Sequence, residues 1–121
     1  MTAQPLTAQT TPDYKPEARL DPATSKLTMA HILVAFIMFG VAALAGVIQG
    51  LVRGGMMELP SGINYYQILS AHGVLMGLVF TTYFIIAVLL AGVSKTTGGL
   101  TALERKLGWI CWTLMTIGTL M

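Results

Sequence analysis

The stretch that decides the fold is residues 65–93, YYQILSAHGVLMGLVFTTYFIIAVLLAGV, which contains no Asp, Glu, Lys or Arg. It is about 29 residues long, whereas about 20 apolar residues are enough to cross the hydrocarbon core of a bilayer. The stretch therefore predicts a transmembrane helix. Its single histidine, His72, needs a reason to be there, because ionisable side chains are costly inside a membrane.

The composition of the whole chain also indicates a membrane protein. Its 121 residues are 55% hydrophobic and only 10% charged, whereas a soluble domain is about one-quarter charged. A formal net charge of +2, with no basic patch interleaved with aromatic residues, argues against a nucleic-acid partner. The single cysteine, Cys111, can form neither an intrachain disulfide nor a cysteine pair for a metal.

Two more apolar runs complete the expected architecture. The first covers about residues 27–51, and the third helix covers about residues 105–121. From Leu107 onward the third run is only about 22 Å long as a helix, short of a core of about 30 Å. We therefore expect an all-α polytopic transmembrane helix bundle with two full spans and the start of a truncated third. We expect such a chain to be the N-terminal portion of a larger protein.

Local signals define the boundaries of these helices. Asp21 followed by Pro22 is a typical helix start. Thr101 and Glu104 have the spacing of a capping box. Gly46 and Gly50 form a GxxxG pair, a pattern that lets another helix approach closely. Residues 1–20 predict a flexible tail, residues 21–121 the N-terminal part of the membrane domain, and residues 52–64 and 94–100 the connecting loops.

The basic residues predict the orientation. Arg53 is the only basic residue in the first loop, and the others precede the first helix or flank the second loop: Lys15, Arg19, Lys26, Lys95, Arg105 and Lys106. The positive-inside rule then places the N-terminus and the second loop in the cytoplasm. We expect a multi-pass protein of a bacterial or archaeal inner membrane, surrounded by lipid. His72 would lie about 10 Å below the outer face, since about seven residues separate it from Tyr65.

His72 is the candidate metal ligand, because a neutral imidazole can bind haem iron through one nitrogen and donate a hydrogen bond through the other. Gly73 leaves room for a flat ring, and Met76 is one of the apolar neighbours that would contact a porphyrin. A stripe of small residues runs alongside: Ser70, Gly73, Gly77 and Thr81. The alternative is a histidine that only packs between helices. His31 is expected at the opposite membrane face, as a packing or interfacial residue.

Residues 65–85, YYQILSAHGVLMGLVFTTYFI, resemble the second helix of subunit I of the haem–copper oxygen reductases. The His-Gly pair followed by apolar residues carries the resemblance. The Tyr-Tyr-Gln lead and the Val-Phe-Thr continuation look most like the B-type branch. The likeness covers about 20 residues, within one expected span.

This resemblance implies a function for the complete subunit. His72 would be one axial ligand of a low-spin haem, with Gly73 and Met76 beside it. Electrons would arrive from cytochrome c or another small redox protein through a subunit II-like partner. A high-spin haem and copper centre would then reduce oxygen to water, coupled to proton translocation. The ligands of that centre belong to later helices in the family, so these 121 residues are not expected to be active alone.

Two other functions remain open at this point. A nitric oxide reductase catalytic subunit belongs to the same superfamily, and its discriminating metal ligands would lie beyond Met121. A small non-catalytic helical membrane subunit, in which His72 is a packing residue, needs no haem at all.

Overall fold

The computed structural model describes residues 20–121, so the predicted tail lies almost wholly outside the described residues. The described part contains helices and connecting loops, with no strand in residues 20–121. The helices are α1 (Pro22–Arg53), α2 (Tyr65–Val74), the π-helical segment η1 (Leu75–Phe80), α3 (Thr81–Thr97) and α4 (Ala102–Leu120). This confirms the all-α prediction.

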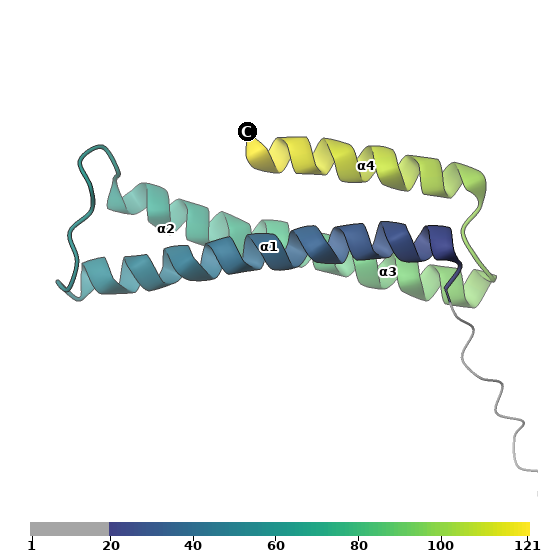
Figure 1. Cartoon of the computed structure of the whole chain (residues 1–121), viewed down its shortest axis with the longest axis horizontal. Coiled ribbons are helices and arrows are strands. Elements are labelled where there is room, and N and C mark those ends of the chain that lie inside the picture. The colour runs from purple at the N-terminus through teal and green to yellow at the C-terminus, as the bar shows by residue number, and fades with distance from the viewer. Residues whose placement is uncertain (1–19) are drawn as a thin grey trace, which may run out of the picture.

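The helices form an elongated, open arrangement. α2, η1 and α3 follow one another as a single rod that lies antiparallel to α1 (Figure 1). After a short turn, α4 runs back in the same direction as α1 and ends near the middle of the rod (Figure 1). The rod and α4 thus both pack against α1.

Capping residues explain where the helices begin and end. Asp21 caps α1 by accepting a hydrogen bond from the backbone N–H of Thr24, and Pro22 starts the helix. A capping box formed by Asn64 and Gln67 starts α2. Gly98 ends α3 at φ 80°, a left-handed conformation that glycine adopts without a steric cost.

The predicted boundaries are close, and the differences have local causes. α1 begins at Pro22, as the Asp21-Pro22 signal predicted, so the helix starts before the apolar run that begins near residue 27. α3 continues to Thr97, past the expected end at 93, because the residue that caps and ends it is Gly98, in the left-handed conformation. The prediction of one regular helix over residues 65–93 was wrong in one respect, since η1 interrupts it.

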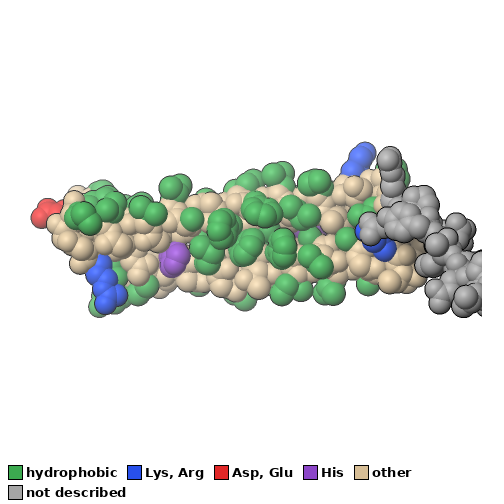
Figure 2. Space-filling model, turned by 90° about the horizontal axis from the view of Figure 1, so that it is seen from below, with side chains coloured by type: hydrophobic (Ala, Val, Ile, Leu, Met, Phe, Trp, Pro, Cys, Tyr) green, Lys and Arg blue, Asp and Glu red, His purple; other side chains and the backbone are tan. Residues whose placement is uncertain are grey.

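Two helical stretches, Pro22–Arg53 and Tyr65–Thr97, are long and apolar enough to cross a membrane. Only 22% and 11% of their most apolar windows are buried within the structure, so most of these side chains face outward. A core helix of a soluble protein would be largely buried instead. Figure 2 shows apolar side chains over the middle of the molecule and charged side chains only toward its two ends.

The small core lies where α1, α3 and α4 meet. Val34, Ala35 and Tyr83 are buried, and Trp112 and Met115 of α4 pack against them. The Tyr83 hydroxyl lies 2.8 Å from the Thr116 hydroxyl oxygen and links α3 to α4. Aromatic rings cluster where α1 meets η1 and α3: Phe36, Phe39, Phe80 and Phe84.

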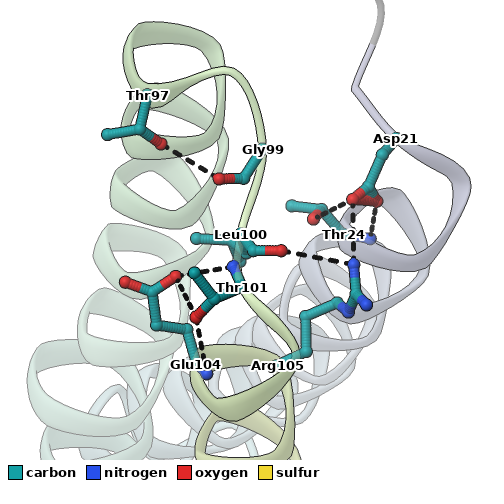
Figure 3. Close-up of polar contacts among 8 residues, drawn as sticks. All are labelled: Asp21, Thr24, Thr97, Gly99, Leu100, Thr101, Glu104 and Arg105. Carbon is teal, nitrogen blue, oxygen red and sulfur yellow. Dashed lines mark hydrogen bonds and ion pairs between the residues drawn. The ribbon is translucent and has the colours of Figure 1, made fainter.

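A polar cluster fastens α4 to the start of α1 (Figure 3). Arg105 Nη1 donates to Asp21 Oδ2 at 3.3 Å and to the Leu100 carbonyl at 3.2 Å. The hydrogen bond from the Thr24 backbone N–H, helped by the Thr24 hydroxyl and the Arg105 charge, keeps the pKa of Asp21 below its usual value. The cluster therefore holds the first turn of α4 against the first turn of α1.

The capping box at the start of α4 completes that cluster. The backbone N–H and the hydroxyl of Thr101 donate to Glu104 Oε2 at 2.7 and 2.8 Å, and the Glu104 N–H donates back to the Thr101 hydroxyl. These reciprocal bonds confirm the motif predicted from the sequence.

Candidate functional site

His72 lies near the C-terminal end of α2 and its side chain reaches across to α1. Its Nδ1 atom is 2.8 Å from the carbonyl oxygen of Ala42. A carbonyl oxygen can only accept a hydrogen bond, so Nδ1 carries the proton in this contact. In the neutral imidazole the other nitrogen, Nε2, then keeps its lone pair. That is the tautomer a histidine needs to bind a metal through Nε2.

Gly46 makes this contact possible. A Cβ atom at position 46 would lie 2.8 Å from His72 Cε1 and 3.0 Å from Nδ1, which is closer than real contacts of this kind. The imidazole therefore occupies the space that a side chain at position 46 would need. Gly50, one turn further along α1, has nothing within 4 Å of the corresponding position. Of the GxxxG pair, only Gly46 is in a close contact.

The stripe of small residues beside His72 is not covered by another part of the described chain. A Cβ atom at Gly73 or Gly77 would meet nothing within 4 Å. Ser70 and Thr81 are exposed as well, whereas Met76 is half-buried. The stripe is thus shallow and open, and at about 100° per residue it lies about 100–180° around the helix from His72.

His31 belongs to a separate place in the structure. It is 1% exposed, its Nδ1 lies 2.9 Å from the Leu27 carbonyl oxygen, and its ring is 5.8 Å from that of Tyr83. Eleven residues of α1 separate His31 from the carbonyl that binds His72, about 16 Å at helical rise. The two histidines therefore lie at separate sites, which confirms the prediction from the sequence.

Two grooves border the rod of α2, η1 and α3. One, of about 480 Å³, lies between α1 and α2 and reaches Ile68 and Ala71, the latter next to His72 in the chain. The other, of about 340 Å³, lies between α4 and the segment from Val74 to Tyr83. The lining of the first groove is almost entirely apolar, so it suits an apolar group better than a polar ligand. The second is mostly apolar but includes Thr82 and Thr119.

Within residues 20–121, no three His, Cys, Asp or Glu side chains come together to hold a metal ion. This concerns ions held by side chains alone. Haem iron needs only one or two protein ligands, so the geometry of His72 is the observation that bears on haem binding.

Comparison with protein-family models, curated proteins and solved structures gives no match for this chain. The resemblance of residues 65–85 to the haem–copper oxygen reductases thus stays a prediction from the sequence. The same holds for the roles of His72, Gly73 and Met76 toward haem.

The structure adds two residues that sequence reasoning did not assign to this site, Ala42 and Gly46. Ala42 contributes only its backbone carbonyl, which no sequence pattern can reveal. Gly46 was noted for close helix approach, but its partner, the His72 ring, depends on the relative positions of two helices.

Proposed function

We propose that this chain is the N-terminal part of the catalytic subunit of a membrane-bound haem–copper oxygen reductase, with His72 as an axial ligand of its low-spin haem. The observation that supports this most is the Nδ1 contact with the Ala42 carbonyl. Histidines that bind metals commonly donate the other ring N–H to such a carbonyl, which fixes the ring and directs Nε2 to the metal.

The proposal also includes a place in the membrane. α1 and the rod of α2, η1 and α3 would cross the bilayer, with α4 as the beginning of the third span. The excess of basic residues at the end where α1 begins would face the cytoplasm of a bacterial or archaeal cell. His72 would then lie in the outer half of the membrane, close to an external electron donor.

In this proposal each residue has a distinct part. The low-spin haem, when bound, supplies an electron-transfer centre. The Ala42 carbonyl orients the imidazole, and Gly46 gives the ring its place against α1. Gly73 leaves the neighbouring surface free, and Met76 with its apolar neighbours keeps water from the ligand. A second axial ligand, the high-spin haem and the copper would be held by other parts of the complete subunit.

The partners follow from the same proposal. A subunit II-like partner would pass electrons from cytochrome c or another small redox protein, and lipid would cover the apolar surface. The reaction of the complete subunit would be oxygen reduction to water with proton translocation.

The test is a spectrum of the full-length protein in membranes. His72→Ala should abolish the α-band of the low-spin haem in the reduced-minus-oxidised difference spectrum. His31→Gln is the matched control, because it changes the other histidine, which bonds within its own helix, and should leave that band in place. An unchanged spectrum in the His72→Ala protein would reject the ligand assignment.

A second candidate is a non-catalytic helical membrane subunit in which His72 only joins two helices. The bond to Ala42 favours it too, since that bond forms without any cofactor. The two candidates differ in the haem content of the purified full-length protein. A protein without haem, whose stability still falls on His72→Ala, would favour the second candidate.

A further inference from the structure

The rod of α2, η1 and α3 contains a turn of π-helix between its two α-helical parts. Residues Leu75–Phe80 form this turn, with regular α-helix before and after it. No proline lies in the turn, and the Thr81 hydroxyl donates to the Met76 carbonyl five residues back at 3.2 Å. π-turns are rare and often lie at functional sites.

The side chains on the two sides of this turn have different partners. Before it, His72 contacts Ala42 and Gly46 of α1. After it, Tyr83 lies between α1 and α4, bonded to Thr116 and packed near His31. In a regular α-helix, eleven residues advance close to three turns, so two such side chains would lie within about 20° of each other.

A π-turn accommodates one extra residue and so rotates everything after it by about 100° relative to a regular α-helix. The rotation places His72 and Tyr83 about 80° apart around the rod. His72 then meets α1, and Tyr83 reaches α4 as well as α1. We propose that the π-turn Leu75–Phe80 is a positioning element: it aligns the haem-ligand face of α2 with α1 while α3 presents Tyr83 to α4. This inference rests on the proposed function for the role of His72, but not for the rotation itself.

The Tyr83 contact offers a readout that does not involve haem. The Thr116 hydroxyl lies 2.7 Å from the Trp112 carbonyl and donates to it, so in the 2.8 Å contact with Tyr83 the phenol is the donor. Tyr83 is only 1% exposed, so its hydroxyl has little access to solvent as a substitute partner. Tyr83→Phe and Thr116→Val should therefore be coupled: the double variant should lower Tm by clearly less than the sum of the two single shifts.

The experiment is deletion of Gly77 in the full-length protein. Deletion removes the extra residue, so the rod becomes a regular α-helix with ten residue steps from His72 to Tyr83. This leaves the two side chains about 80° apart, as the π-turn does, so the low-spin haem band and the coupling between Tyr83→Phe and Thr116→Val should both persist. Gly77→Ala is the matched control: it keeps the residue count, its Cβ meets nothing within 4 Å, and both readouts should persist. A deletion variant that loses either readout, or that no longer folds, would overturn the proposal.

The opposite change is the insertion of one alanine after Val79 in the wild-type rod. It adds a second extra residue and turns Tyr83 by about a further 100° relative to His72, so at least one of the two readouts should be lost. An insertion variant that keeps both readouts would overturn the positioning role. If the wild-type protein carries no haem, the proposed function fails, and the coupling between Tyr83 and Thr116 still decides the rotation.

Discussion

Gly46→Ala is expected to separate His72 from α1. The added methyl group would lie 2.8 Å from His72 Cε1 and 3.0 Å from Nδ1, so either the imidazole or one of the helices must move. The ring cannot turn away freely, because its Nδ1 is held at 2.8 Å by the Ala42 carbonyl. We therefore expect the close contact and the hydrogen bond to weaken together.

The size of the effect follows from opposing contributions. Overpacking costs about 1–3 kcal/mol, and a weakened hydrogen bond costs about 0.5–1.5 kcal/mol. Replacing glycine by alanine inside a helix returns about 0.5–1 kcal/mol. The net expectation is a loss of about 0.5–4 kcal/mol in the free energy of unfolding.

Gly50→Ala is the matched control on the same helix, because a Cβ atom there meets nothing within 4 Å. It should be neutral or slightly stabilising. Both variants can be compared by denaturant unfolding of the detergent-solubilised protein, monitored by circular dichroism. Equal stabilities of the two variants would refute the reasoning, since it depends on the His72 ring filling the space beside Gly46.

Two further predictions concern the polar cluster that joins α1 and α4. The lowered pKa of Asp21 means that its carboxylate stabilises the fold at pH values above its unfolded pKa, and that this contribution disappears as the pH falls below about 4 toward the folded pKa. Asp21→Asn should remove this part of the acid sensitivity, as seen by comparing the two unfolding curves between neutral pH and pH 2.5, and identical pH profiles would contradict it. Thr101→Ala should destabilise the start of α4 by about 0.5–2 kcal/mol, because it removes both hydroxyl contacts of the capping box. Thr101→Ser keeps the hydroxyl and should restore most of the lost stability. Amide hydrogen exchange checks this: in Thr101→Ala it should become faster only in the first turn of α4, and unchanged exchange there would contradict the prediction.

The helices themselves could be predicted from the sequence, because their signals are local. Apolar runs without charge, the Asp21-Pro22 start and the capping box of Thr101 and Glu104 each act within a few residues. The separation of His31 from His72 also followed from the sequence, since it needs only two antiparallel helices.

The site could be predicted only in part. His72 stood out as a histidine in an apolar run, and the stripe that includes Gly73 is indeed open. Its contacts with the Ala42 carbonyl and Gly46 depend on the register between α1 and α2, which no local pattern encodes. The π-turn was missed for a similar reason: residues 75–80 read as ordinary apolar helix, and the contacts of the flanking segments with α1 and α4 are not local.

The most direct test of His72 as a haem ligand is chemical rescue of the full-length His72→Gly protein. This substitution leaves a space the size of the lost side chain, which free imidazole can enter. The account predicts that the low-spin haem spectrum is absent in the variant and returns when imidazole is added. A wild-type spectrum in the variant without imidazole would contradict it.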